Sequence, residues 1–323
     1  MTTYKEIRGT NIEAVANDPS NPVVGQVWYN TTSNTVKGLI NNLGSWATAN
    51  VMNTGRNNVA GVGTQTAALA FGGTASPGIT NATEIWNGTN WTEVNNLQTA
   101  RAALAGAGTT TSALAFGGNP PRTGKTEQYN GTNWTEVNDL NTARNSLSGA
   151  GASNTSALAF GGIVPPDNAT AVTELWNGSN WTEVNDLNTA RLRGAGAGIQ
   201  TSALAFAGQT PSTSVFALTE LWNGTNWTEV NDMNTARREL SGAGSSNTNA
   251  LAISGRGKEV ESWNGTNWTE VGDINNLKND SGAAGTNTAA IAFGGESPAA
   301  GGTNSDNTEI FNAGPTTITF DVS

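Results

Sequence analysis

The stretch Trp176-Asn177-Gly178-Ser179-Asn180-Trp181-Thr182-Glu183-Val184 decides the fold, because near-copies of it recur along the whole chain. Asn-Gly suits the centre of a tight turn in which both residues have positive φ, and the aromatic and β-branched residues on either side favour paired strands. The stretch therefore predicts a β-hairpin. Its copies lie at residues 86–94, 129–137, 222–230 and 263–271, with a weaker relative at residues 45–51.

The composition indicates an all-β protein. Of the 323 residues, 12% are charged and 36% are hydrophobic, while 40 are glycine. Turn-forming residues and small strand residues alternate throughout, which is typical neither of helical proteins nor of acidic disordered chains. Because a chain built from one repeat can form a single closed body of this length, we expect one large domain and a small arm.

Charge and missing residue types exclude several classes of function. The net charge of −10 argues against a nucleic-acid partner, since such binding depends on Lys and Arg. The chain has no cysteine for a disulfide, a thiolate metal site or a nucleophile. It has no histidine, the commonest general base and metal ligand. We therefore expect a non-enzymatic protein with no catalytic residues, cofactor or metal.

The N-terminal region differs from the rest. No apolar run follows Met1, and no stretch approaches the ~18 apolar residues of a membrane span, so we expect neither a signal peptide nor membrane insertion. Residues 1–23 are polar and predict an arm with too little apolar surface to fold alone. Residues 23–29 and 35–40 then predict two strands, followed by a third around Trp46.

A second periodic signal is a strand that ends in Gly-Gly or a close variant. Successive copies are spaced by 45, 44, 46, 47 and 40 residues, which is the range of four-stranded propeller blades. The copies are Phe71-Gly72-Gly73, Phe116-Gly117-Gly118, Phe160-Gly161-Gly162, Phe206-Ala207-Gly208, Ile253-Ser254-Gly255 and Phe293-Gly294-Gly295.

Each repeat divides into strands according to what its residues tolerate. Residues 147–151 are mostly tiny and predict the innermost strand, where the backbones of all blades approach one axis. Residues 156–160 alternate small with large, as packing between blades requires, and residues 173–184 supply the outer hairpin. The connections that vary most are candidates for recognition, because free loops on a rigid scaffold often carry it. They lie at residues 74–82, 119–125, 163–172, 209–218 and 296–306.

These features resemble the kelch family of β-propellers. The resemblance rests on an apolar strand ending in Gly-Gly, then an aromatic, a turn, a Trp and a downstream Arg, as in residues 114–118, Tyr129, Trp134 and Arg144. It covers about residues 46–311 and implies six four-stranded blades. Asn130 and Asn177 stand where kelch repeats often carry Asp. Some kelch proteins are copper oxidases, but this chain lacks the His and Cys ligands that such a site needs.

A ring of six blades can close in two ways. In the first, the strand around Trp46 pairs with residues 307–311 and completes the last blade. In the second, residues 316–322 are the outer strand of that blade, and residues 23–51 form a separate hairpin or an incomplete seventh blade. We favour six blades closed by the N-terminal strand, because no seventh glycine-rich strand is present. The predicted domains are an attachment arm and β-hairpin at residues 1–44 and a β-propeller at residues 45–323.

Residues Gly25-Gln26-Val27-Trp28-Tyr29-Asn30-Thr31-Thr32, followed by Lys37, carry a second resemblance. They are similar to the opening of structural and tail-fibre proteins of tailed bacteriophages, especially marine ones, in which similar Asn-Gly-Thr-Asn-Trp repeats occur. This resemblance implies a virion component that is assembled in the host cytoplasm.

A positive charge follows each hairpin Trp by ten residues. Because each cation precedes a glycine-rich strand, the six would ring one mouth of the central channel and could bind a carboxylate or phosphate there. We favour a packing role, in which each cation binds a neighbouring blade through carbonyls or a Glu. The six are Arg56, Arg101, Arg144, Arg191, Arg237 and Lys278.

Carboxylates also recur, but none marks a catalytic blade. A glycosidase needs two carboxylates with divergent pKa values in one cleft, whereas these occur in nearly every repeat. We expect them on solvated strand faces or beside the cations. One set is Glu84, Glu127, Glu174, Glu220, Glu261 and Glu309, and the other is Glu93, Glu136, Glu183, Glu229 and Glu270. We expect Asp139, Asp186 and Asp232 to cap turns rather than bind calcium, and the repeated Trp residues to pack between blades rather than stack on sugars.

The sequence thus favours a virion structural protein, either a tail fibre or appendage or a capsid decoration. Its arm would bind other virion proteins, its propeller would bind a host-surface polysaccharide or protein, and it would be multimeric in the assembly. The alternatives are a glycan-binding lectin or adhesin outside a virion and, less favoured, a polysaccharide-cleaving enzyme.

Overall fold

The computed structural model describes residues 12–212, 214–297 and 302–320, and it groups the chain into two units. The smaller unit contains Met1–Gly44 and Ala313–Ser323, and the larger contains Ser45–Asn312. The sequence had placed residues 313–323 with the propeller. The described residues form strands and loops, and they include no helix that could span a membrane.

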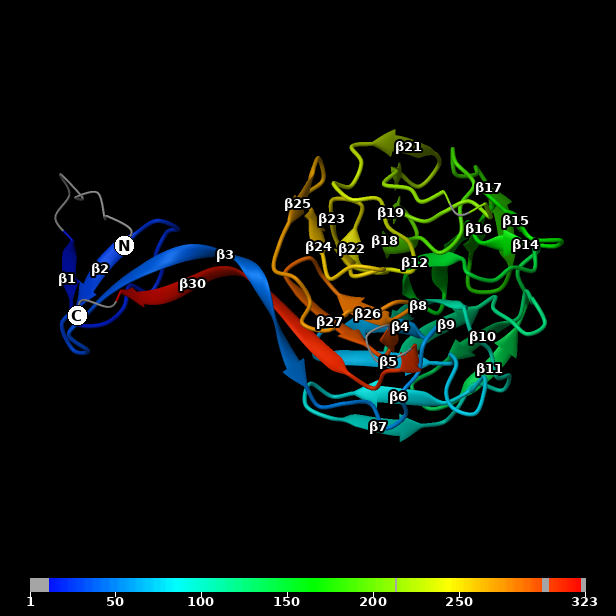
Figure 1. The fold of residues 1–323 in the computed structure, drawn as a ribbon, viewed down its shortest axis with the longest axis horizontal. Helices are drawn as coiled ribbons and strands as arrows, with labels where there is room; N and C mark the ends of the chain where they lie inside the picture. The colour runs from blue at the N-terminus through cyan, green and yellow to red at the C-terminus, as the bar shows by residue number, and fades with distance from the viewer. Residues whose placement is uncertain (1–11, 213, 298–301, 321–323) are drawn as a thin grey trace. The chain divides into compact units, whose positions relative to one another are not determined.

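The larger unit is a β-propeller (Figure 1). Five of its sheets are four-stranded and antiparallel, in the order inner strand to outer strand along the chain. The first contains β4 (Ala60–Thr64), β5 (Ala67–Phe71), β6 (Thr83–Trp86) and β7 (Trp91–Val94), and the second β8 (Ala105–Thr109), β9 (Ser112–Phe116), β10 (Thr126–Tyr129) and β11 (Trp134–Val137). The third contains β12 (Ser148–Ser153), β13 (Ser156–Phe160), β16 (Thr173–Trp176) and β17 (Trp181–Val184). The fourth contains β18 (Ala195–Ile199), β19 (Ser202–Phe206), β20 (Thr219–Trp222) and β21 (Trp227–Val230), and the fifth β22 (Ser241–Ser246), β23 (Asn249–Ile253), β24 (Val260–Trp263) and β25 (Trp268–Glu270).

The prediction of six four-stranded blades is wrong, because the structure has five. The remaining large sheet has six strands. Its order is β1-β2-β3-β30-β27-β26, and β26 contacts both β22 and β4. The strands are β1 (Glu13–Val15), β2 (Val27–Asn30), β3 (Thr35–Ala49), β26 (Gly282–Gly285), β27 (Ala289–Phe293) and β30 (Thr308–Phe320). The long strands β3 and β30 contribute residues to both units, which is why this sheet exceeds four strands.

Closure uses the N-terminal strand, as the first of the two predicted routes requires. β3, which contains Trp46, lies next to β30, and the Trp46 ring is 5.1 Å from the Phe311 ring. The backbone carbonyl of Trp46 accepts a hydrogen bond from Asn275 Nδ2 at 3.1 Å. Residues 316–320 belong to β30 and do not form a separate outer strand, while residues 321–323 lie outside the described residues.

The inner strands are as crowded as their tiny side chains predict. A Cβ atom on Gly149 of β12 would lie 2.7 Å from Cζ of Phe116 and 2.9 Å from the carbonyl oxygen of Gly106, both in the preceding blade. Real Cβ atoms almost never approach other atoms this closely, so the backbones can converge only where side chains are absent.

The outer hairpins form, but their turn is not the one predicted. Trp176 pairs with Trp181, which leaves a four-residue loop in place of a two-residue turn. Gly178 has a φ of 92°, whereas Asn177 does not have positive φ. The Asn177 side-chain oxygen instead accepts hydrogen bonds from the backbone N–H groups of Ser179 and Asn180, each at 2.9 Å. The Asn177 side chain therefore caps the loop, as Asn side chains do in other turns.

The hydrophobic core lies between neighbouring blades. Trp181 of β17 contacts Phe116 of the preceding blade at a ring distance of 5.0 Å, and its Nε1–H donates to Thr126 Oγ1 at 3.0 Å. Only 5% of its surface is exposed, so the Trp residue packs between blades and is not available to stack on a sugar.

The smaller unit is organised by Asp18. Its carboxylate accepts hydrogen bonds from Trp28 Nε1 at 3.0 Å, Asn30 Nδ2 at 2.7 Å and Lys37 Nζ at 2.8 Å. The hydrogen bond from Lys37, followed by those from Trp28 and Asn30, lowers the pKa of Asp18 to about 2. Through these hydrogen bonds, Asp18 connects the turn before β2 with both β2 and β3.

Candidate functional site

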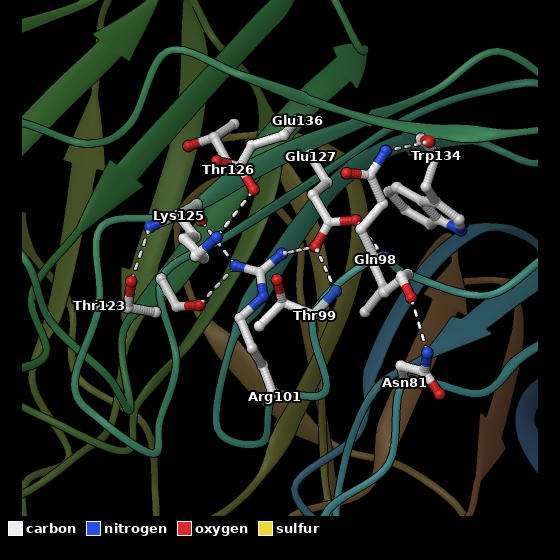
Figure 2. A network of polar contacts seen from close by, with 12 residues as sticks. Asn81, Gln98, Thr99, Arg101, Thr123, Lys125, Thr126, Glu127, Trp134 and Glu136 are labelled. Carbon is white, nitrogen blue, oxygen red and sulfur yellow. Dashed lines mark hydrogen bonds and ion pairs between the residues drawn. The ribbon is translucent and has the colours of Figure 1, made fainter.

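All six predicted cations are buried and five of them are ion-paired; Figure 2 shows one of these, Arg101. Arg101 donates from Nη1 to the carbonyls of Gly117 at 2.8 Å and Lys125 at 2.6 Å, and from Nη2 to Glu127 Oε1 at 3.0 Å. The Glu127 carboxylate also accepts from the backbone N–H of Gln98 at 2.6 Å. Burial lowers the pKa of Arg101, and the charge of Glu127 partly offsets this effect.

The same arrangement recurs around the ring. Five ion pairs join a buried Arg to the buried Glu two positions before the hairpin aromatic. They are Arg56–Glu84, Arg101–Glu127, Arg144–Glu174, Arg191–Glu220 and Arg237–Glu261. In addition, the carbonyl of Arg101 accepts a hydrogen bond from Gly73 N of the preceding blade at 2.8 Å. The backbone at each cation therefore contacts the preceding blade, whereas the Arg101 side chain binds its own blade and not the neighbouring blade that the sequence predicted.

Lys278 departs from this pattern. Its Nζ donates to the carbonyls of Gly294 at 3.3 Å and Asn307 at 3.0 Å, and the described residues include no ion pair within 4.0 Å of it. Glu309, the counterpart of the paired glutamates, instead accepts from the backbone N–H groups of Asn275 and Asn276. Burial lowers the pKa of Lys278 to about 8, against the raising effect of Glu309.

The other recurring carboxylates fall into two groups. The second set of glutamates is on the outermost strands, where Glu136 and its counterparts are exposed. The turn aspartates cap the backbone, as expected: Asp139, Asp186 and Asp232 accept from the N–H of the residue that begins the third strand of their blade. The described residues contain no group of three or more Asp, Glu, His or Cys that could hold a metal ion.

A pocket of about 150 Å³ opens at one mouth of the central axis. The six predicted cations do not line it. It is lined instead by the residue two positions after each cation, and behind it lies a narrower space of about 90 Å³ walled mainly by Gly and Ala of the inner strands. The six residues are Asn58, Ala103, Ser146, Arg193, Glu239 and Asp280.

These six residues, which we call the axial ring, share an unusual backbone conformation. All have positive φ, between 49° and 60°, which is uncommon for residues other than glycine. Hydrogen bonds run from the backbone N–H of one member to the carbonyl of the member in the preceding blade, with N···O distances of 2.8–3.1 Å from Ala103 to Asp280. These backbone hydrogen bonds hold the six residues in place around the pocket.

Charge is concentrated on one side of the axial ring. Glu239 is 3% exposed and pairs with Arg193 and with Arg256, whose Nε lies 2.9 Å from Oε2. Burial acts to raise the pKa of Glu239, but the hydrogen bond from Arg256 and the charges of Arg193, Arg256 and Arg238 hold it below its usual value.

Asp280 contrasts with Glu239. Burial and the neighbouring charge of Glu239 raise the pKa of Asp280 to about 7, although Arg193 acts in the opposite direction. Its backbone N–H donates to Glu239, but within the described ranges no side chain forms a hydrogen bond or ion pair with its carboxyl group. The pocket is therefore lined by a carboxyl group that lacks a partner.

The variable loops open on the same face as the pocket. The residue before five of the six axial-ring positions pairs with the residue just after the Gly-Gly segment, as in Asn145 with Ile163 and Leu192 with Gln209. β14 (Ile163–Val164) and β15 (Asn168–Ala169) form a small hairpin in one loop, and β28 (Glu296–Ser297) and β29 (Thr303–Asn304) form another. Arg122 and Asp167 link two neighbouring loops at 2.7 Å. Loops and axial ring together form what we call the loop face.

The axial ring was not predicted from the sequence, although a signal was present. In the six aligned repeats the cation is followed two residues later by Asn, Ala, Ser, Arg, Glu or Asp, whereas the flanking glycine-rich strand hardly changes. A position that varies within an otherwise uniform repeat is one that packing does not determine.

Comparison with models of known protein families gave no match, and comparison with curated proteins gave none either.

Proposed function

We propose that this protein is a non-enzymatic structural component of a bacteriophage particle, a tail fibre or appendage or a capsid decoration, whose loop face recognises a host-surface ligand. One observation carries the proposal. The repeats are nearly identical where they build the blades, and they differ at the loops and the axial ring, which share one face. Variable residues on a rigid scaffold are a common basis of recognition.

The smaller unit would attach the propeller to other virion proteins. It contains six of the nine large hydrophobic residues that are exposed in the described chain, namely Ile12, Val23, Val24, Ile40, Leu43 and Phe320. Exposed apolar residues that gather in one small unit favour contact with a partner. The resemblance of residues 25–32 to phage tail-fibre proteins supports a virion partner, which the unit would bind through β-strand addition.

The kelch-like character of the ring and the absence of catalysis belong to the same proposal. The buried Arg and the Gly-Gly strand ends support a kelch-type propeller. The recurring glutamates serve blade packing or lie on exposed outer strands, and neither position offers the carboxylate pair of a glycosidase.

Removal of the smaller unit tests the attachment role. A variant of residues 45–312 retains the core between blades and should fold, as measured by circular dichroism and cooperative unfolding. It should fail to associate with particles, whereas the full chain associates. Normal incorporation of the 45–312 variant would refute attachment through the smaller unit, whereas failure of the full chain to associate with particles would favour a lectin outside a virion.

A further inference from the structure

We propose that the axial pocket binds a primary ammonium group of the surface ligand, with the carboxylate of Asp280 as its partner. The inference rests on the proposed recognition function for the ligand's origin, but binding in the pocket can be measured independently of it. An amino-sugar residue and a lysine side chain carry the same group, and the experiment separates these two sources.

The charge of the pocket favours a cation over an anion. Its axial ring contains one cation, Arg193, and two acids, Glu239 and Asp280. Arg193 is already paired with Glu239, which also accepts hydrogen bonds from Arg256 at 2.9 and 3.2 Å. An anionic ligand would therefore meet a guanidinium whose charge Glu239 already offsets, together with the unpaired carboxyl group of Asp280. An ammonium group would instead supply the partner that Asp280 lacks.

The rest of the ring suits a small polar ligand. Asn58 and Ser146 stand among the other axial-ring residues and can both donate and accept hydrogen bonds. The volume of about 150 Å³ is several times the space that one water molecule requires, so a group larger than a single water or a bare ion fits. A divalent metal is disfavoured, because the two carboxylates of the ring do not make a site of three or more ligands within the described chain.

The ionisation of Asp280 gives the pocket a pH dependence. The charged groups around it are Glu239 and Glu296, which raise its pKa, and Arg193 and Arg256, which lower it. Ammonium binding requires the ionised carboxylate, so affinity should rise about tenfold from pH 6 to pH 8 for a group with a pKa near 7. The ε-ammonium of lysine stays protonated over this range, so any change reports on the protein.

NMR titration of the full-length protein with three probes tests the inference. Nα-acetyl-lysine amide carries only the ε-ammonium, glucosamine carries an ammonium on a sugar, and N-acetylglucosamine has the same ring without the charge. We expect the two ammonium probes to shift the backbone amides of residues 239 and 280–282, and N-acetylglucosamine to bind at least tenfold more weakly. Tighter binding of glucosamine than of the lysine probe would assign the source to an amino sugar, and the reverse order to a lysine side chain.

Substitution of the carboxyl group completes the test. Asp280→Asn should weaken ammonium binding at least tenfold, whereas Asp273→Asn, which makes the same change at an exposed turn, should leave it within twofold. Equal binding by wild type and Asp280→Asn, or no rise in the affinity of the unmodified protein for Nα-acetyl-lysine amide between pH 6 and 8, would overturn the inference. Host-cell binding is measured in parallel: if cells are bound but ammonium probes are not, the pocket assignment fails and the proposed function stands. If the probes bind but cells are not bound, the pocket assignment stands and the proposed function fails.

Discussion

Replacement of Arg101 by Ala tests whether the buried cations stabilise the blades that they bind. The change removes two hydrogen bonds to carbonyls, at 2.8 and 2.6 Å, and the ion pair to Glu127 at 3.0 Å. Removing one partner of a buried ion pair costs about 3–5 kcal/mol, because the other charge remains buried. Glu127 keeps the backbone hydrogen bonds from Gln98 and Thr99, so we expect the lower end, about 3 kcal/mol.

The assay is urea unfolding followed by tryptophan fluorescence, with the free energy of unfolding taken from the midpoint at constant slope. Lys125→Ala in the same blade is the matched control. Its ion pair with Glu136 has side chains that are 35% and 45% exposed, so its loss should cost at most about 1 kcal/mol. The double variant Arg101→Met/Glu127→Gln should recover part of the loss, because no charge is then left unpaired and the Gln side-chain oxygen can still accept from the backbone N–H of Gln98.

The reasoning fails if Arg101→Ala is no less stable than Lys125→Ala. It also fails if phosphate raises the melting temperature of the wild type but not of Arg101→Ala. That result would mean that the cation binds an anion instead of the carbonyls and the carboxylate of its own blade.

Three further substitutions test the packing and the charges of the ring. Lys278→Arg should raise the free energy of unfolding by about 0.5–2 kcal/mol, measured by urea unfolding, because it restores the residue that the five paired blades share. Gly149→Ala should cost about 1–3 kcal/mol in the same assay, since its Cβ would meet Phe116 at 2.7 Å, whereas Gly78→Ala, which meets nothing within 4 Å, should be nearly neutral. The pKa of Asp280 near 7 lies above that of an unfolded Asp near 3.9, so the wild type should lose stability as pH rises from 4 through 7. Asp280→Asn should flatten that loss in unfolding curves measured from pH 4 to 8, and an unchanged slope would contradict the assignment.

Repetition made the architecture predictable. A strand of tiny residues, a strand end of Gly-Gly or a close variant and an aromatic hairpin recur at fixed places in most repeats, and each has one physical explanation. The predicted inner strand at residues 147–151 and the hairpin at residues 173–184 correspond closely to β12, β16 and β17. The number of four-stranded blades was wrong because the length of β3 and β30 depends on pairing between the chain's two ends, which no local pattern specifies.

The candidate site was less predictable. Five of the six cations found by spacing share one arrangement and Lys278 differs, but spacing could not tell whether such a side chain turns toward the axis or toward its own blade. Ser146 and its counterparts, each two positions after a cation, reach the pocket because their φ is positive. Serine gives no sequence signal for that conformation. Within Trp-Asn-Gly, the Asn was assigned to the turn for its tolerance of positive φ, whereas its side chain is used as a cap.

Recognition through the loop face can be tested directly because the chain contains no cysteine, so one introduced thiol can be labelled specifically. Asp167→Cys lies in a loop of that face, and Thr155→Cys lies in the exposed turn between β12 and β13, at the opposite end of the same blade. Each is coupled to a bulky polyethylene glycol maleimide, and binding to host cells and to an array of surface glycans is measured. We predict that the label at position 167 reduces binding at least tenfold and that the label at position 155 leaves it unchanged. Equal binding by both labelled proteins, loss only from position 155, or no binding by the unlabelled protein would contradict recognition through this face.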